Sequence, residues 1–286
     1  QNLPLDAVTD AAGEPLICSV EIATDTIYFR AWRINVGRCP LYLLDANLPE
    51  NPAHYRDLTL RVYGGDSTTR IQQEILLGIG GVKLLRALGE EPAVFHMNEG
   101  HAAFLALELI CEKMGNGGSF KDALAATREE CTFTTHTPVP AGHDRFHSEL
   151  MSYSLNLYEK HLDLSHMDLM ALGRLDAEDE QERFCMTVLA LNTARTANGV
   201  SELHGQVSRK MWRAKYDVPV DDVPIGHITN GTHLLGWMSR PARDFWQPRL
   251  GNGPKFYERI NDAEFWSQVE NPDFISDEEL WALRYR

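Results

Sequence analysis

Polar side chains that could take part in acid–base chemistry gather where strand-like runs give way to loops. The stretch HMNEGHAAF places Asn98, Glu99 and His101 at a strand-to-helix turn. A histidine beside a carboxylate can be oriented by it and can hydrogen-bond a ligand that is rich in hydroxyl groups. The first N–H groups of a helix add donors for an anion. The alternative is a structural turn, in which Glu99 caps the helix and His101 packs.

A second loop, TTHTPVPAGHDRF, places His136 directly after a strand-like run. Pro138 and Pro140 restrict the backbone, so the loop should be stiff and extended. Stiff polar loops at strand ends suit a binding site. His143 and His147 lie four residues apart, which fits either half of a metal site or the solvated start of a helix.

Asp66 follows a glycine pair in RVYGGDSTTR, directly before a helical pattern. The pair Gly64-Gly65 predicts a mobile bend, and Asp66 can either cap the helix or face a ligand. HMNEGH is not the H-E-x-x-H motif of zinc-binding helices, and His96 is expected to point into the sheet, away from His101. We therefore predict no metal site. Hydrolase triads, phosphate-binding loops and dinucleotide-binding glycine fingerprints do not occur.

The elements that must position these loops alternate between strand and helix patterns. Apolar residues at helix spacing predict a helix over 68–89, weakened or kinked at Gly80-Gly81. Strands are predicted at 93–97 and 131–135, with helices between them. From 145 to about 216 the chain reads mostly as helix, and a further strand is predicted at 225–229.

The amino-terminal part reads as a hairpin, because residues 16–22 and 27–34 both alternate around a polar turn. The run PLYLLD, at 40–45, predicts a buried strand. In the carboxyl-terminal part, helices are predicted from Arg240, and Ser276 with Glu279 forms the sequence signature of a capping box.

This order of elements predicts the α/β fold class, with a mainly parallel sheet and a large helical insertion. In such sheets ligands bind outside the carboxyl ends of the strands. The loops at 98–101, 135–144 and 229–233 should therefore meet at one edge. Because no linker interrupts the chain, we predict a single domain over 1–286.

Composition limits the partners. The chain has 286 residues, with 27 Lys and Arg against 41 Asp and Glu, and a formal net charge of −14. This charge repels nucleic-acid phosphates and anionic lipid, so neither a nucleic acid nor a membrane is an expected partner. The odd number of cysteines without a C-x-x-C motif predicts buried, reduced thiols at Cys18, Cys39, Cys111, Cys131 and Cys185. The start at Gln1 fits a trimmed protein or a piece of a larger one.

Taken in this order, the loops resemble those of the α-glucan (glycogen/maltodextrin) phosphorylase family, in particular its shorter bacterial and archaeal branch. The stretches that carry the resemblance are VGRCPLYLLDANLPEN, VYGGDSTTRIQQEILLGIGG, HMNEGHAAF, TTHTPVPAGHDRF, SELHGQVSRKMW and ITNGTHLLGWM. The resemblance implies glucosyl transfer from an α-1,4-glucan to inorganic phosphate, which gives glucose 1-phosphate. It also implies the two-lobed GT-B glycosyltransferase fold, of which this chain would form most of the Rossmann-like amino-terminal lobe.

The resemblance also assigns roles to the residues. His136 matches the family histidine that contacts the sugar in the catalytic subsite, and is the candidate catalytic residue. Glu99 and His101 match residues that line the same cleft, and Asp66 falls in the loop that gates it. With Asn98, these three are the candidate substrate-binding residues.

The family's cofactor is pyridoxal phosphate, whose phosphate group assists the attacking phosphate. The family's glycine-rich segment and its S-G-T-S-x-x-K lysine motif are not found in this sequence. We therefore expect no cofactor on this chain, an inactive isolated chain, and a requirement for a carboxyl-terminal lobe. A cytoplasmic location and a possible homodimer are further implications. The alternative is a non-catalytic carbohydrate-binding or interaction module derived from this lobe.

Overall fold

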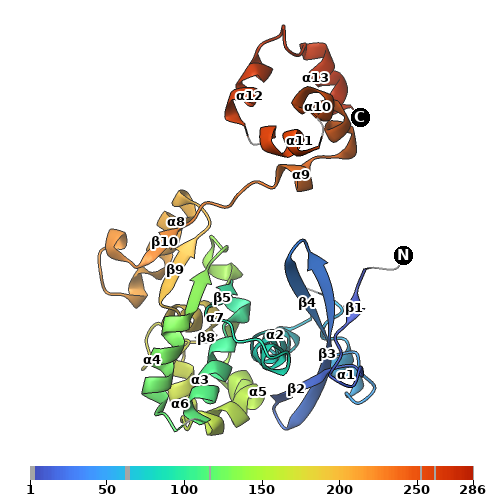
Figure 1. Ribbon diagram of the computed structural model, residues 1–286. Helices are drawn as coiled ribbons and strands as arrows, with labels where there is room; N and C mark the ends of the chain where they lie inside the picture. Colours follow the sequence, from blue (N-terminus) through green and yellow to red (C-terminus); the bar gives the residue numbers. More distant parts are fainter. Residues whose placement is uncertain (1–3, 62–64, 116, 252, 261, 286) are drawn as a thin grey trace. The chain divides into compact units, whose positions relative to one another are not determined.

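A computed structural model describes the chain except for residues 1–3, 62–64, 116, 252, 261 and 286 (Figure 1). The described contacts divide it into two compact units, 1–229 and 230–286. Each unit has its own cluster of buried apolar side chains. The single domain predicted over 1–286 stays a prediction.

The amino-terminal part of the first unit is an antiparallel sheet of β1 (Asp6–Ala7), β2 (Ile17–Ile22), β3 (Asp25–Val36) and β4 (Cys39–Asp45). The β2–β3 pairing confirms the predicted hairpin. The prediction of a buried strand at 40–45 is wrong in its burial: β4 pairs with β3, and Leu41 and Leu43 are 48% and 42% exposed. An antiparallel strand can leave one face to solvent, whereas a strand inside a parallel sheet cannot.

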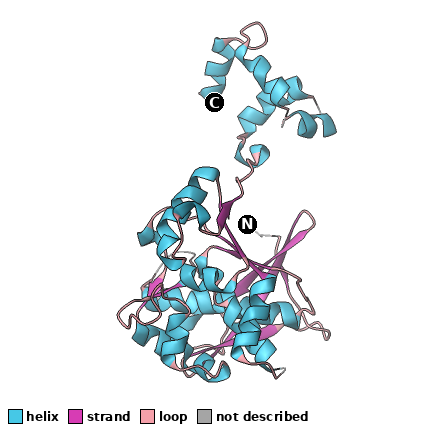
Figure 2. Cartoon of the chain, turned by 90° about the vertical axis from the view of Figure 1, so that its left-hand side faces the viewer, coloured by secondary structure: helices cyan, strands magenta, loops and turns pink. Residues whose placement is uncertain are grey.

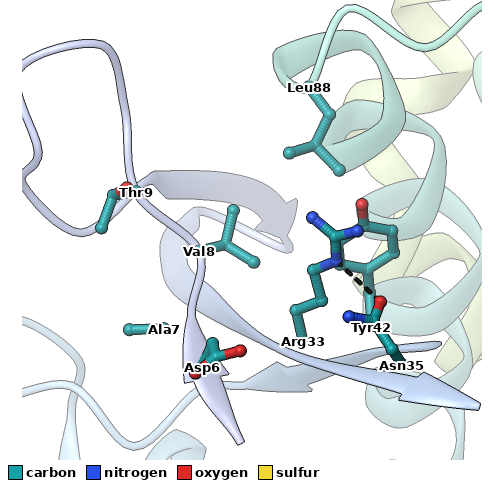
Figure 3. Close-up of a pocket in the computed structure, with 8 residues that line it drawn as sticks. All are labelled: Asp6, Ala7, Val8, Thr9, Arg33, Asn35, Tyr42 and Leu88. Carbon is teal, nitrogen blue, oxygen red and sulfur yellow. Dashed lines mark hydrogen bonds between the residues drawn. The ribbon is translucent and has the colours of Figure 1, made fainter. Parts of the chain in front are cut away.

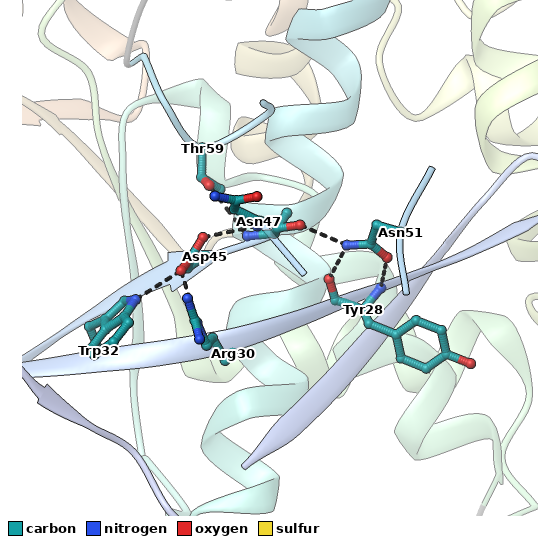
Figure 4. Close-up of polar contacts among 8 residues, drawn as sticks. Tyr28, Arg30, Trp32, Asp45, Asn47, Asn51 and Thr59 are labelled. Atoms are coloured by element: carbon teal, nitrogen blue, oxygen red, sulfur yellow. Dashed lines mark hydrogen bonds and ion pairs between the residues drawn. The ribbon is translucent and has the colours of Figure 1, made fainter. Parts of the chain in front are cut away.

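The loop after β4 is fixed by two polar side chains (Figure 4). Asp45 Oδ2 accepts hydrogen bonds from Arg30 Nε (3.0 Å) and Trp32 Nε1 (2.9 Å). Asn51, which is 1% exposed, accepts from the Tyr28 N–H (2.8 Å) and donates to Tyr28 O (2.7 Å) and Ala46 O (2.8 Å). The Asn51 side chain thus satisfies the backbone N–H and C=O of Tyr28, as a neighbouring strand would. It also holds the loop that leads into the short helix α1 (Ala53–Arg56) against the sheet.

Helix α2 (Ser67–Ala87) packs against both β2 and α3 (Leu105–Gly115) (Figure 1). It runs unbroken through Gly80-Gly81, so the predicted kink is wrong. Two of its glycines allow close packing instead. A Cβ at Gly78 would lie 2.7 Å from the Leu105 backbone nitrogen, and a Cβ at Gly80 would lie 3.2 Å from the Phe29 ring.

The parallel sheet has the order β10-β9-β6-β5. Figure 2 shows the strands of the chain in magenta among the cyan helices. Its strands are β5 (Phe95–Asn98), β6 (Cys131–Thr134), β9 (Thr196–Gly199) and β10 (Ile225–His227). These pairings confirm the α/β fold class with a parallel sheet. Strand β9 lies inside the stretch that was predicted to be helical.

Helices connect the strands of this sheet along the chain. Between β5 and β6 lie α3 and α4 (Phe120–Glu130). Between β6 and β9 the chain forms α5 (Ser148–His161), α6 (His166–Ala171) and α7 (Met186–Thr193), all within the predicted helical stretch. The short strand β7 (Arg145–Phe146) precedes α5 and pairs with β8 (Phe184–Cys185), which lies between α6 and α7. Helix α8 (Glu202–Trp212) follows β9 and packs on β9 and β10.

The second unit is helical, as predicted. It contains α9 (Leu234–Trp237), α10 (Arg240–Leu250), α11 (Pro254–Arg259), α12 (Ala263–Ser267) and α13 (Asp277–Arg284) around an aromatic core with Trp246 and Phe265. Ser276 and Glu279 form the predicted capping box at the start of α13.

The cysteines correspond only partly to the prediction of buried thiols. All five are free, and Cys131 and Cys185 are buried, but Cys39 is exposed at the start of the edge strand β4. Cys39 is exposed because β4 pairs with β3 and leaves its other face to solvent.

The close approach of α2 makes a testable prediction. Gly78→Ala should destabilise the chain by about 1–3 kcal/mol, because the new methyl group must move the backbone at Leu105. Gly81→Ala is the matched control: a Cβ there meets nothing within 4 Å. This second change should stabilise by about 0.5–1 kcal/mol, through helix propensity alone. Urea unfolding measures both, and equal effects at the two positions would contradict close packing as the role of Gly78.

Candidate functional site

Backbone hydrogen bonds bring the ends of three parallel strands together. The Glu99 N–H, just after β5, donates to Thr134 O at the end of β6 (2.9 Å). The Thr135 N–H donates to Asn198 O in β9 (3.0 Å). The loops after β5 and β6 therefore meet at the carboxyl edge, as predicted. The third predicted loop, 229–233, belongs from Asn230 onward to the second unit, so its place at this edge stays a prediction.

Glu99 connects the first two loops with its side chain. Its Oε2 accepts hydrogen bonds from the His136 backbone N–H (3.1 Å) and from Thr137 Oγ1 (2.5 Å). It makes no capping hydrogen bond to the short helix that follows it, so the structural alternative of a capping Glu99 is wrong. The carboxylate instead holds the loop that carries His136.

The backbone of Glu99 is strained, with φ of 77° and ψ of 167°. This region is populated almost only by glycine, and another residue there costs about 1–3 kcal/mol. Such strain persists only where surrounding contacts enforce it, and it is concentrated at functional sites. The strained residue is also one of the candidate site residues predicted from the sequence.

The His136 ring is oriented by Asn98. The distance from His136 Nε2 to Asn98 Oδ1 is 2.9 Å. Because an amide oxygen only accepts, the His136 ring carries its proton on Nε2 in this arrangement. A neutral His136 then leaves Nδ1 as a hydrogen-bond acceptor at an exposed position.

A second set of polar side chains near His136 and Asn98 was not predicted from the sequence. Thr134 Oγ1 donates to Asn198 Oδ1 (3.1 Å) and therefore accepts from His96 Nε2 (2.8 Å). His96 is exposed while its neighbours in β5 are buried, so the expectation that it points into the sheet is wrong. Because alternate residues of a strand share a face, the sequence could have predicted that His96 lies on the same side of β5 as Asn98. The contact with Asn198 could not be predicted, because strand β9 was not expected.

His101 lies deeper, beside a charged cluster. Burial and then the charge of Arg70 lower the pKa of His101, so its ring is neutral at pH 7. Arg70 Nε lies 2.9 Å from Glu74 Oε1, and Arg70 Nη2 lies 2.9 Å from Asp144 Oδ2. His101, Arg70 and Glu74 line one cavity of about 450 Å³.

Asp66 caps α2, as one of its two interpretations predicted. Its Oδ1 accepts from the Thr69 N–H (2.9 Å), and this bond lowers the pKa of the carboxyl group. Asp66 also lines an open cavity of about 510 Å³ with Arg70 and Asp144. Its role toward a ligand stays a prediction, and Gly64 of the predicted bend lies outside the described residues.

His143 and His147 do not form half of a metal site. His143 is buried, and its Nδ1 lies 2.8 Å from Thr187 Oγ1. His147 is exposed at the start of α5. Across the described part of the chain, no group of three or more His, Cys, Asp or Glu side chains could hold a metal ion. Among those same residues, no helix is both long and apolar enough to cross a membrane.

A further pocket lies on the antiparallel sheet (Figure 3). It has a volume of about 330 Å³ and is lined by residues of β1, β3 and β4, together with Leu88 at the end of α2. None of the candidate site residues lines this pocket. Of the candidate residues, Asn98, Glu99 and His136 are joined by hydrogen bonds at the carboxyl edge of the parallel sheet.

The fold and this edge define an α/β segment with a cluster of polar side chains at one sheet edge, and comparison with known proteins adds the family. No protein-family model matches the chain. Over 287 residues the chain is 39% identical to the maltodextrin phosphorylase of Thermococcus litoralis, covering 100% of this chain and 33% of that protein. It is 40% identical over 299 residues to the glycogen phosphorylase of Mycobacterium tuberculosis, covering 99% of this chain and 33% of that protein.

The glycogen phosphorylase of Aquifex aeolicus is 32% identical over 284 residues, covering 99% of this chain and 40% of that protein. These matches confirm the resemblance to the maltodextrin and glycogen phosphorylase family, and they extend along the whole chain. The chain spans about a third to two fifths of the length of these relatives, as a segment of such a protein would.

The contacts of Glu99 make a testable prediction. Glu99→Gly and Glu99→Ala both remove the acceptor of the His136 N–H, and a hydrogen bond to a charged group contributes about 1.5–3 kcal/mol. Hydrogen exchange at the His136 amide should therefore accelerate by about tenfold or more in both variants. The glycine variant should be more stable than the alanine variant by about 1 kcal/mol, because only glycine relieves the strained backbone. Unchanged exchange at His136 in both variants would contradict the bridging role of Glu99.

Proposed function

We propose that the chain is part of an α-1,4-glucan phosphorylase, a glycosyltransferase that transfers a glucosyl unit from a glucan to inorganic phosphate. The observation that carries the proposal is the strained Glu99, whose carboxylate fixes the His136 loop at the carboxyl edge of the parallel sheet. The relatives that bear the names maltodextrin and glycogen phosphorylase support the same conclusion.

In this proposal, the chain forms most of the amino-terminal lobe of a GT-B fold, and the glucan binds outside the carboxyl ends of β5 and β6. Support comes from the parallel sheet and from the polar groups at its edge. The lobe that completes the cleft would be supplied by a further part of the protein.

The candidate residues have separable roles. His136 hydrogen-bonds hydroxyl groups of the glucosyl unit, and Asn98 holds its ring for that purpose. Glu99 positions the loop through Oε2. His101, neutral because it is buried beside Arg70, lines the inner wall of the cleft, and Asp66 lies at the mouth that the gate covers. A hydrogen bond that strengthens as positive charge develops on the sugar lowers the barrier selectively.

We infer that the described residues of this chain do not hold pyridoxal phosphate. A Schiff base requires a lysine that faces a ligand cavity. None of the three cavities described above is lined by a lysine. Lys113 pairs with Glu130, and Lys215 contacts Asn192. We therefore place the cofactor and the groups that bind inorganic phosphate in the part of the protein outside this chain, and we derive no step through them.

The kinetic prediction concerns His136 in a phosphorylase that contains this chain. His136→Ala should lower kcat more than it raises KM, because the bond to the sugar strengthens in the transition state. The loss in kcat/KM should be about tenfold to several-hundredfold, from the lost bond and the unpaired partner together. His147→Ala is the control, since its side chain is exposed and caps nothing. Unchanged kcat with a lowered melting temperature would remove His136 from the site.

A second prediction concerns the isolated chain. With maltodextrin and phosphate, it should release no glucose 1-phosphate, because half of the charged arrangement around the transferred group is supplied elsewhere. Incubation with pyridoxal phosphate and borohydride should label no single lysine stoichiometrically. Product formation by a pure sample, or one specific lysine adduct, would contradict this division of the active site.

A further inference from the structure

The loop that carries His136 is bound at its far end by a second, buried contact. His143 is 7% exposed, and its Nδ1 lies 2.8 Å from the hydroxyl oxygen of Thr187, the second residue of α7. Thr187 is 1% exposed. The next residue of the loop, Asp144, accepts a hydrogen bond at its backbone oxygen from the Met186 N–H (3.1 Å). Two successive residues of the loop are therefore bound to the start of α7.

The His143 side chain also packs against an aromatic ring. It meets the Trp212 ring edge-on, with the two ring centroids 4.9 Å apart, and Trp212 is 2% exposed. Burial lowers the pKa of His143 more than the charge of Glu99 raises it, so the imidazole is neutral at pH 7. A neutral imidazole can form a hydrogen bond with a hydroxyl group without a counter-charge. His143 is therefore suited to hold a loop in place inside the protein.

Thr187 lies against the strained turn at Glu99 as well. Gly100 follows Glu99 and is buried. A Cβ on Gly100 would lie 3.1 Å from Thr187 Oγ1 and 3.2 Å from the Thr187 backbone nitrogen, which is too close for an unhindered methyl group. The start of α7 thus packs against the loop after β5, and the same Thr187 hydroxyl group binds the loop after β6.

These contacts form a closed network that begins and ends at Glu99. Its Oε2 accepts a hydrogen bond from Thr137 Oγ1 at the start of the His136 loop. The loop then folds back on itself, since a Cβ at Gly142 would lie 2.7 Å from the Thr137 methyl carbon. His143 comes next and binds Thr187, which packs against the residue after Glu99. The strained turn is therefore held by the loop and by α7 together.

We propose that His143 and Thr187 are positioning residues of the candidate site, because their buried hydrogen bond holds the His136 loop and the strained Glu99 turn against α7. A residue in a conformation that glycine favours stays there only where several contacts enforce it. The carboxylate of Glu99 makes one such contact, and the bond between His143 and Thr187 is another. That His136 contacts a glucan rests on the proposed function, whereas the role of this bond in the loop does not.

Hydrogen exchange at the His136 amide, measured by NMR on the 286-residue chain, tests the proposal. Thr187→Val keeps the shape of the side chain and removes the hydroxyl group. Exchange at His136 should accelerate by about two- to tenfold, the range expected for a neutral hydrogen bond. Thr187→Ser keeps the hydroxyl group and should restore the wild-type rate.

Thr127→Val is the matched control. Thr127 is also buried in a helix, but its hydroxyl group has no hydrogen-bond partner among the residues that the structure describes. Its replacement should leave exchange at His136 unchanged. Equal exchange rates at His136 in Thr187→Val and Thr127→Val would overturn the proposal.

A measurement on the wild-type chain keeps the test independent of whether a variant folds. His136 donates its N–H to Glu99 Oε2, and Met186 donates its N–H to Asp144 O, in two different parts of the network. If the network opens as one unit, both amides should exchange with the same dependence on low concentrations of urea. Two separate openings, each with its own urea dependence, would contradict the proposal.

The last experiment measures positioning in a phosphorylase that contains this chain. Thr187→Val should lower kcat by about two- to tenfold with KM nearly unchanged, because a displaced His136 weakens a bond that strengthens in the transition state. Combined with His136→Ala, it should lower kcat no further, because it acts through that side chain. Effects on kcat that add would show that Thr187 only packs. If His136→Ala left kcat unchanged, the proposed function would fail, and exchange at the His136 amide would still decide the role of Thr187.

Discussion

The carboxylate of Glu99 is the contact on which the arrangement of the candidate site depends. It accepts hydrogen bonds from the backbone of His136 and the hydroxyl group of Thr137, and so joins the loop after β5 to the loop after β6. To make these contacts, its backbone adopts a conformation that glycine favours. Glu99 is therefore both the strained residue of this edge and the residue whose side chain holds the His136 backbone.

Helix α2 is the element of the first unit that packs both on the antiparallel sheet and on the helix after β5. Helix α2 can pack against both β2 and the start of α3 because glycines replace side chains at the points of closest approach. The same helix carries Arg70 and Glu74, and its packing brings them beside His101. Close helix packing and the charged cluster are therefore consequences of one helix position. A side chain at Gly78 would disturb both together.

Much of this fold could be predicted from the sequence, because period and capping are local signals. The hairpin of β2 and β3, helix α2, strands β5 and β6, and the capping box at Ser276 all follow from spacing within a few residues. Strand β9 could not be predicted, since its four residues, Thr-Ala-Asn-Gly, carry neither alternation nor an apolar run. The exposure of β4 depends on what covers its outer face, which no local pattern encodes.

The candidate site divides in the same way. Asn98, Glu99, His101 and His136 could be identified from their places after strands, together with the family resemblance. The bond between Asn98 and His136, and the row from His96 through Thr134 to Asn198, depend on which strands are neighbours. Strand order and burial are tertiary properties, so the sequence alone gave the residues without their partners.

A crystal structure of the phosphorylase that contains this chain, with maltodextrin bound, tests the central claim most directly. The account predicts a glucosyl unit within hydrogen-bond distance of the His136 ring, outside the carboxyl ends of β5 and β6, with Glu99 still bound to the His136 backbone. A glucan bound only elsewhere, such as at the pocket on the antiparallel sheet, with His136 out of reach of any sugar, would contradict it.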